Sequence, residues 1–316
     1  MNPLSIQKLD LNLWDLKNKK ELKFSESHFI SFVKNKIKLN LKKTKCPCGT
    51  SQKSTLVKQI FDLKYYQCVC KTVYLNPTIS ENNLNEIYKN NGIYEKHRRQ
   101  VLSQRNAKLS RNLINKRKAL QIFTLLKRKK FKILDFGCGD GKFLDYLNKK
   151  IKKEYLYGFD VNTSLKNNSK RFNVISETKT LIDQKFDIVT LWGVLEHINN
   201  PKNFVKFISK IIAKKGFLVI EIPSSESLLS KYTFQSDHIP IRWLEPYRHL
   251  SFFSLKCIKK IFKNKFEIKY IETNGLDLQT IFNYEKNYDE LDIINAQKKL
   301  NDNLLGDHYR IFLKKL

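Results

Sequence analysis

The sequence predicts an α/β fold in which an open sheet lies between layers of helices. The first observation is an apolar run at residues 131–135 that ends in an acid, turns through three glycines and continues into a helix near Lys142. The second is the strand pattern at residues 155–159, which again ends in an acid, Asp160. The third is a buried strand expected at residues 186–191, followed by an amphipathic helix. Open α/β sheets of this kind bind ligands at the carboxyl ends of their strands.

The glycine turn is built to let the backbone approach a ligand closely. Gly137, Gly139 and Gly141 stand at alternate positions after the first strand, so no side chain lies between the turn and a bound molecule. The turn also leaves unpaired N–H groups at the start of the helix. Asp160 lies 19 residues beyond Gly141, where it can accept hydrogen bonds from both ribose hydroxyls of a nucleoside.

The spacing of the glycines separates two kinds of nucleoside site. A dinucleotide site uses G-x-G-x-x-G and faces a pyrophosphate, whereas this chain has G-x-G-x-G preceded by Asp135, which would repel that group. The acid suits an ammonium group, such as that of S-adenosylmethionine (SAM). In this acid and its three glycines the chain resembles the class I SAM-dependent methyltransferases. A glycine-rich turn in some other α/β protein is the alternative.

The resemblance extends over residues 131 to about 275 and over residues 305–315. Residues 192–198 resemble the L-E-H-[IV] loop after the family's fourth strand. Residues 243–254 resemble an R-H-L-x-x-F-[ST] segment of a branch often associated with sugar and cell-surface glycan modification. The resemblance implies a Rossmann-like seven-stranded sheet with helices on both faces, closed by an antiparallel strand and preceded by a small zinc-ribbon-like and helical region.

The resemblance also assigns cofactor-binding residues, motif by motif. They are Asp135, Gly137, Cys138, Gly139, Gly141, Asp160, Val161, Glu177, Trp192 and Glu196. Two places depart from the family pattern. Glu177 is the one acid after the third strand that could contact the adenine amino group, and Trp192 with Gly193 stands where many relatives carry a bulkier polar residue.

Two histidines, His197 and His249, stand where the family places residues next to the methyl acceptor. Methyl transfer requires the acceptor to be aligned with the S–CH3 bond and to lose a proton, which histidine can take at neutral pH. His197 could instead only shape its loop, and His249 could anchor the helix that follows. The expected acceptor contacts are Arg242, Trp243, Tyr247 and Arg248. Cationic and aromatic groups together suit a sugar that carries phosphate, although the tryptophan could also belong to the core.

Four of the six cysteines form two close pairs: Cys46, Cys48, Cys68 and Cys70. Such pairs around a strand-like segment resemble a zinc ribbon, and in a reducing cytoplasm a metal is favoured over a disulfide. The usual spacing is C-x-x-C, so C-x-C predicts a tighter chelate with fewer supporting hydrogen bonds. Structural zinc is expected, with a metal-free hairpin as the alternative. Cys138 and Cys257 are expected to be small buried apolar residues.

Composition limits the choice of partners. The chain has 316 residues and a formal net charge of +30, and Lys outnumbers Arg 50 to 10. Because phosphate and base recognition favour the planar Arg fork, we attribute the excess of Lys mainly to AT-rich coding. An acidic substrate would still be attracted. No apolar run reaches the roughly 18 to 20 residues that span a bilayer, and the N-terminus lacks a signal-peptide pattern. A cytoplasmic protein without a membrane span is expected.

The chain divides into four expected parts. They are an N-terminal helical segment at 1–44, a zinc-ribbon-like module at 45–78, a helical linker at 79–130 and a SAM-binding domain at 131–316 with a helical insertion at about 276–304. We expect a SAM-dependent methyltransferase that modifies a small acceptor such as a sugar, a nucleotide sugar or a glycan precursor. One alternative is an RNA methyltransferase that docks through the basic helix and the Cys module. Another is a non-catalytic zinc-bearing binding module.

Overall fold

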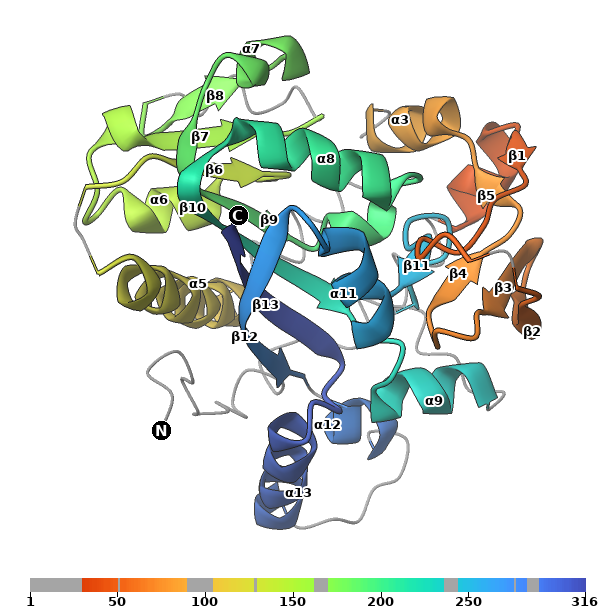
Figure 1. Ribbon diagram of the computed structural model, residues 1–316. Helices are drawn as coiled ribbons and strands as arrows, with labels where there is room; N and C mark the ends of the chain where they lie inside the picture. Colours follow the sequence, from red (N-terminus) through yellow and green to blue (C-terminus); the bar gives the residue numbers. More distant parts are fainter. Residues whose placement is uncertain are drawn as a thin grey trace.

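The computed structural model describes residues 30–50, 52–89, 105–127, 130–161, 170–235, 244–275, 277–282 and 290–316. Figure 1 shows a central twisted sheet with helices on both faces and a smaller β-structure beside it. The central sheet has seven strands in the order β12-β13-β10-β9-β6-β7-β8. The predicted α/β class and seven-stranded sheet are therefore confirmed. None of the helices described is long and apolar enough to cross a membrane.

Five parallel strands form the part of the sheet that carries the predicted nucleoside site. They are β6 (Ile133–Phe136), β7 (Leu156–Phe159), β8 (Asn173–Ile175), β9 (Phe186–Trp192) and β10 (Ile212–Pro223). Every residue of β6 is buried, as expected of a strand covered by helices on both faces. The helix predicted after it is α6 (Lys142–Leu147), and the one predicted after β9 is α8 (Pro201–Ile211).

The other edge of the sheet is antiparallel. β13 (His308–Lys315) lies between β10 and β12 (Phe266–Asn274) and runs antiparallel to both. This is the closing strand predicted from the end of the sequence. Between β12 and β13 the chain forms α12 (Asp277–Phe282) and α13 (Glu290–Asp302), where a helical insertion was expected.

Neighbouring residues of the central strands point into two separate cores. Ile188 belongs to the cluster that contains residues of α6 and of α5 (Arg105–Leu126). Val189, the next residue, belongs to the cluster that contains residues of α8 and of α11 (Leu255–Phe262). Figure 1 shows α8 and α11 beside one another in front of the sheet. This alternation follows from the period of two in a strand, and it lets the central strands pack against helices on both faces of the sheet.

The cysteine region builds a second, four-stranded sheet in the order β11-β4-β3-β2. Three strands come from the cysteine region itself: β2 (Thr55–Ile60), β3 (Leu63–Gln67) and β4 (Val73–Leu75). The fourth, β11 (Ser251–Phe252), comes from beyond β10 and pairs antiparallel with β4. The two parts of the chain are therefore joined by backbone hydrogen bonds as well as by side-chain packing.

The structure describes the expected N-terminal helical segment, residues 1–44, from residue 30 onward. Residues 30–36 are helical, whereas Leu41–Lys42 form a short strand, and residues 1–29 lie outside the described residues. A two-stranded sheet joins β1 (Leu41–Lys42) to β5 (Thr78–Ile79), and α3 (Glu81–Lys89) follows.

Candidate functional site

The glycine turn closes tightly over the ends of β6 and β7. The backbone N–H groups of Gly137 and Cys138 both donate to the carbonyl oxygen of Phe159, at 2.7 and 3.1 Å. Gly141 has a φ of +70°, and a Cβ there would lie 2.4 Å from the ring of Phe172. The turn thus needs glycine at Gly141 for two reasons, the left-handed backbone and the absence of space.

Asp160 is joined directly to this turn. Its Oδ2 accepts a hydrogen bond from the backbone N–H of Gly139 at 2.8 Å. Val161, the next residue, is a large apolar side chain that is 42% exposed. At the end of β7, Asp160 would bind the ribose. Val161 beside it is an accessible apolar side chain that could cover a base.

Asp135 is a buried carboxylate at the end of β6. Thr190 Oγ1 donates to its Oδ1 at 2.7 Å, and the residue is 2% exposed. Burial raises the pKa of Asp135 to about 7, while Thr190 and the Lys118 ammonium lower it and Asp160 raises it further. A cationic group bound at this carboxylate would favour its ionised form, so the site suits the ammonium group of an amino acid.

A buried charge network lies beneath α5, next to Trp192. Lys118 Nζ lies 3.2 Å from Glu221 Oε1 and 4.1 Å from the centroid of the Trp192 ring. Arg310 donates from Nε to Glu221 Oε2 at 2.8 Å and from Nη1 to Gln121 Oε1 at 2.7 Å. No motif in the sequence points to this network, because its members stand on four elements far apart in the chain. The one local signal was the presence of polar residues on the buried face of α5.

The predicted catalytic histidines lie side by side. His197 belongs to the short helix η3 (Leu195–His197), and the centroids of its ring and the His249 ring are 4.9 Å apart. The backbone N–H of Leu250 donates to the carbonyl oxygen of Glu196 at 2.8 Å. The structure therefore joins the L-E-H loop to the R-H-L segment, two motifs separated by about fifty residues in the sequence.

The two histidines differ in their partners. His197 Nδ1 lies 2.8 Å from the carbonyl oxygen of Arg248. His249 Nε2 lies 3.5 Å from a carboxylate oxygen of Glu245, while its buried Nδ1 has no hydrogen-bond partner among the described residues. His197 therefore holds two backbone segments together, whereas one ring nitrogen of His249 has no partner in the described part of the chain.

Burial controls the protonation of this cluster. Burial raises the pKa of Glu196 to about 8 and lowers the pKa of His249 to about 3. The pKa of His197 is also lowered by burial. Both histidines are thus neutral at pH 7. Further buried polar atoms that lack a partner within the described part of the chain are Glu196 Oε2, Trp192 Nε1, Ser225 Oγ and Ser230 Oγ. Buried polar groups are normally paired, so the unpaired atoms of Glu196 and His249, whose Oε1 and Nε2 lie 4.0 Å apart, are candidates for contact with a polar ligand.

His308 is a further histidine near the cluster, and no motif in the sequence points to it. Its Nδ1 lies 2.7 Å from Asp307 Oδ1. Burial lowers the pKa of His308, but Asp307, Glu221 and Glu196 together raise it to about 9. His308 is therefore a cation at pH 7. It lies on the closing strand, far from the other motifs in the sequence, so no sequence pattern indicates a charged histidine beside them.

The residues predicted to contact the acceptor do not all lie in one place, and two of them are outside the described residues. Arg242 and Trp243 lie outside the described residues. Tyr247 is fully buried and donates from its hydroxyl to Asp62 Oδ1 at 2.6 Å, on the side of the second sheet. Arg248 is 2% exposed and lies 3.4 Å from Glu245. Glu177, predicted for adenine, is exposed just before α7 (Thr178–Ile182).

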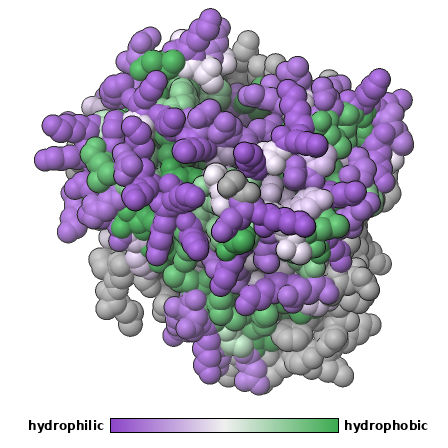
Figure 2. Space-filling view, turned by 45° about the vertical axis from the view of Figure 1, so that its right-hand side comes forward, coloured by the Kyte–Doolittle hydropathy of each residue, from purple (hydrophilic) through white to green (hydrophobic). Residues whose placement is uncertain are grey.

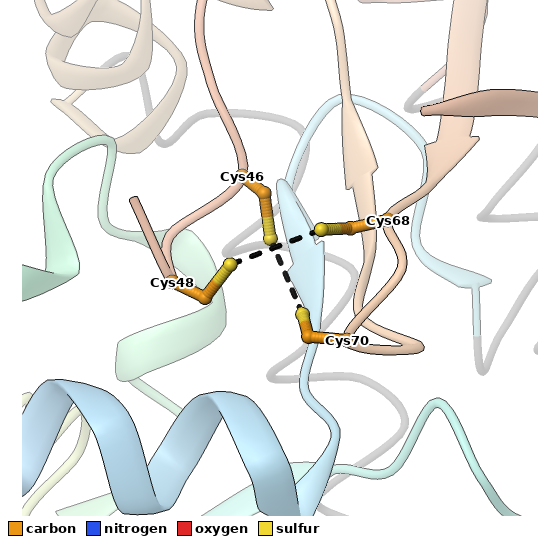
Figure 3. Close-up of side chains that lie close together, drawn as sticks. All are labelled: Cys46, Cys48, Cys68 and Cys70. Atoms are coloured by element: carbon orange, nitrogen blue, oxygen red, sulfur yellow. Dashed lines mark hydrogen bonds between the residues drawn. The ribbon is translucent and has the colours of Figure 1, made fainter. Parts of the chain in front are cut away.

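The four paired cysteines converge, as Figure 3 shows. Cys46 and Cys70 are 3.6 Å apart between sulfurs, and Cys48 and Cys68 are 3.8 Å apart. All four sulfurs lie within 4.8 Å of one another and are buried. A tetrahedral site with Zn–S bonds of about 2.3 Å has sulfur–sulfur edges of roughly 3.8 Å. The four thiols thus fit a structural zinc ion.

The C-x-C pairs also keep backbone support. The backbone N–H of Gly49 donates to the carbonyl oxygen of Cys46 at 2.8 Å, and that of Lys71 donates to the carbonyl oxygen of Cys68 at 2.7 Å. A turn therefore closes around each pair. The smaller number of N–H to sulfur bonds expected from the C-x-C spacing stays a prediction.

Comparison with known proteins agrees with the site. A family described as "Methyltransferase domain" matches residues 94–265, more than half of the chain, and the chain belongs to this family. It is a SAM-dependent methyltransferase. A search of curated proteins found no match to this sequence.

Three solved structures are similar in fold. A SAM-dependent methyltransferase from Archaeoglobus fulgidus has 22% identity and a TM-score of 0.45, over 65% of this chain and 94% of that chain. The plantazolicin methyltransferase BpumL, in complex with a monoazolic desmethylPZN analog and SAH, has 18% identity and a TM-score of 0.41, over 61% and 79%. An S-adenosylmethionine-dependent methyltransferase from Mesorhizobium loti has 12% identity and a TM-score of 0.40, over 58% and 90%.

Proposed function

We propose that the protein transfers the methyl group of SAM to a small hydroxylated acceptor, a sugar, a nucleotide sugar or a glycan precursor. The observation that carries this proposal is that buried polar atoms of Glu196, Ser225, Ser230 and His249 have no hydrogen-bond partner among the described residues. The atoms belong to a carboxylate, an imidazole and hydroxyls, which hydrogen-bond sugar hydroxyls well. When bound, SAM supplies an activated methyl group, so the protein only has to align the acceptor and remove its proton.

The cofactor would be held at both of its ends. Asp135 would bind the ammonium group, and Asp160 would bind the ribose beside the glycine turn. Val161 is placed to cover the adenine, and Trp192 would face the methionine end. Glu177 remains the candidate for the adenine amino group.

His249 is the proposed proton acceptor. The carboxylate of Glu245 faces its Nε2 and fixes that nitrogen as the N–H donor, so Nδ1 carries the lone pair. This Nδ1 is the histidine nitrogen without a partner among the described residues. His197 instead orients the loop through the carbonyl of Arg248, and Glu196 Oε2 offers a further contact to the acceptor.

The same side chains could alternatively hold a cation. One ligand atom from each of Glu196, His197 and His249 lies within 4.8 Å of the others. A cation there would activate the acceptor directly and would make the activity depend on added metal. Assays with EDTA and with added magnesium or manganese therefore separate the two mechanisms. Activity that is unchanged by both supports His249 as the base.

RNA is the second candidate acceptor, because a protein with a net charge of +30 attracts the phosphates of nucleic acid. Figure 2 shows hydrophilic side chains over most of one face of the molecule. RNA binding would weaken steeply with salt, whereas methylation of a sugar would change little. A screen with radiolabelled SAM against nucleotide sugars, glycan fragments and RNA, each at low and high salt, tests the proposal. Methylation of RNA alone, with a steep dependence on salt, would overturn the sugar assignment.

A further inference from the structure

The two edges of the central sheet can be compared for charge. The parallel strands β6 to β10 all start at one edge, here called the amino edge, and end at the other, the carboxyl edge, where the glycine turn lies. β12 starts at the amino edge and β13 ends there, because Lys315 pairs with Phe266 and Lys314 pairs with Phe217. Every strand of the sheet therefore places one of its ends at each edge.

Lysine dominates the amino edge and is missing from the carboxyl edge. Thirteen lysines, two acids and no arginine stand in the amino-edge segments, residues 130–132, 148–155, 183–185, 212–216, 263–265 and 314–316. Five acids and no lysine or arginine stand in the carboxyl-edge segments, residues 137–141, 176–177, 193–200, 224–227 and 303–307. A bias toward lysine codons would raise lysine at both edges, so it does not explain this difference.

The amino-edge lysines come from distant parts of the chain and lie close together. Lys185 Nζ donates to the carbonyl oxygen of Lys210 at 2.8 Å. Lys315 Nζ donates to the carbonyl oxygen of Ile212 at 2.7 Å. Burial lowers the pKa of Lys315, and the charges of Lys185 and Lys265 lower it further. The segments before β9 and β12 and the end of β13 therefore bring their cations to one place.

Several of these cations are exposed and are not neutralised by acids. Among the described residues, no ion pair joins an acid to the following exposed lysines: Lys152, Lys214, Lys263 and Lys265. Cations held on one surface without acids between them create a positive field that attracts an anionic partner.

The amino edge lies far from the predicted cofactor site. β9 crosses the sheet with seven residues, and a strand rises about 3.3 Å per residue, so the two edges are roughly 20 Å apart. Figure 1 shows the start of β10 and the marked C-terminus on the side of the central sheet away from the four-stranded sheet. A partner at the amino edge would therefore leave the carboxyl edge uncovered.

We infer that the amino edge of the central sheet is a docking surface for the anionic face of a lipid bilayer. The type of cation favours a bilayer over nucleic acid. Phosphate and base recognition in nucleic acid favours the planar fork of arginine, which these segments lack. An anionic bilayer instead attracts any cation near its surface. Ile182, which is 50% exposed at the end of α7, adds an apolar side chain at the same edge.

Binding to lipid vesicles tests this inference without a measurement of methyl transfer. At about 0.1 M salt, where charges more than about 10 Å apart are largely screened, the full chain should sediment with vesicles of phosphatidylcholine and phosphatidylglycerol. It should stay in solution with vesicles of phosphatidylcholine alone. The variant with Lys152→Gln, Lys214→Gln, Lys263→Gln and Lys265→Gln should bind about 100-fold more weakly or less, since each lysine contributes roughly fivefold. Its affinity for SAM should be unchanged.

The matched control removes the same charge from the cysteine region. It carries Lys42→Gln, Lys43→Gln, Lys53→Gln and Lys64→Gln, which are also exposed, and should lose less than about tenfold. If the amino-edge variant does not fold, the pair Lys263→Gln and Lys265→Gln gives the same comparison with a loss of roughly 25-fold.

Three results would overturn the inference. One is the absence of binding to the phosphatidylglycerol vesicles, and another is an equal loss in the amino-edge variant and its control, because net charge alone would then explain the binding. The third is displacement of the protein from the vesicles by a stoichiometric amount of single-stranded RNA, because the surface would then fit nucleic acid better.

Discussion

Asp135 is the residue whose chemistry most narrowly defines the cofactor. Burial raises the pKa of its carboxyl group to about 7 in the free protein, so the group is only partly ionised at neutral pH. Thr190 donates a hydrogen bond to one of its oxygens. Asp135→Asn removes the charge, keeps the shape and preserves an acceptor for Thr190. We expect the dissociation constant for SAM to rise about 10- to 100-fold, the usual range for a hydrogen bond to a charged group. Isothermal titration calorimetry measures it, and unchanged affinity would remove Asp135 from the cofactor site.

The raised pKa of Asp135 also predicts how SAM binding depends on pH. The pKa is about 7 in the free protein, and a bound ammonium group lowers it. Binding of SAM therefore releases a proton below pH 7, and the affinity should fall as the pH drops, by up to about tenfold per unit. Above pH 7 this dependence should disappear. Titrations between pH 5.5 and 8 test the prediction, with Asp135→Asn as the control, since its affinity should lack this dependence.

His249 is the residue on which turnover should depend most. His249→Ala removes the proposed proton acceptor, and turnover should fall about 100- to 10,000-fold. His197→Ala should cause a smaller loss, because it removes only a group that orients the loop. Neither change should alter the affinity for SAM, which calorimetry can confirm in the same samples. If His197→Ala were the more damaging of the two, the roles assigned to the histidines would have to be exchanged.

The residues that could be predicted are those identified by local spacing. Asp135, the glycines and Asp160 lie within one strand-turn-helix-strand unit, so their order in the sequence gives their arrangement. The partners of the buried charges could not be found this way. Lys118 meets Glu221 across about a hundred residues, and nothing near either residue identifies the other.

At the scale of elements, the glycine turn is the part of the fold that tolerates least change. Gly141→Ala places a Cβ at a φ of +70° and within 2.4 Å of the Phe172 ring. Backbone strain and the clash together should lower the free energy of unfolding by about 3 kcal/mol or more. Gly49→Ala is the matched control, since Gly49 has a φ of +74° but nothing within 4 Å of its added Cβ. It should cost about 1 kcal/mol, and equal losses in chemical denaturation would contradict the role of the Phe172 contact.

The strands and helices of the central sheet were predicted better than the second sheet. β9 and β3 follow clear apolar or alternating patterns, and the closing strand β13 was expected from a family resemblance. β11 has two residues and pairs with β4, which lies about 180 residues earlier. A strand of two residues is too short to show an alternating pattern, and nothing near it in the sequence indicates so distant a partner. The pairing could therefore not be predicted.

At the scale of the whole molecule, backbone hydrogen bonds connect the cysteine region to the proposed acceptor site. β11 belongs to the sheet of the cysteine region and directly follows His249 and Leu250. The backbone N–H of Leu75 donates to the carbonyl oxygen of Leu250, which continues the link. Loss of metal should therefore disturb the acceptor side of the site more than the glycine turn, which lies at the ends of β6 and β7.

Removal of zinc tests this connection. Treatment with a strong zinc chelator should lower the melting temperature by roughly 5 °C or more, because metal binding contributes to folding. It should also lower turnover while changing the affinity for SAM by less than about threefold. Restored turnover after zinc is added back serves as the control. A large loss of SAM affinity with full turnover at saturating SAM would contradict the assignment of the metal to the acceptor side.

The whole account depends on the pocket formed by Asp135, the glycine turn and Asp160, and calorimetric titration with SAM tests it most directly. We predict binding of one SAM per chain by the unchanged protein and no measurable binding by Asp160→Ala, with the same far-UV circular dichroism spectrum for both. A folded, unchanged protein that produces no heat of binding with either SAM or its demethylated product would contradict the account.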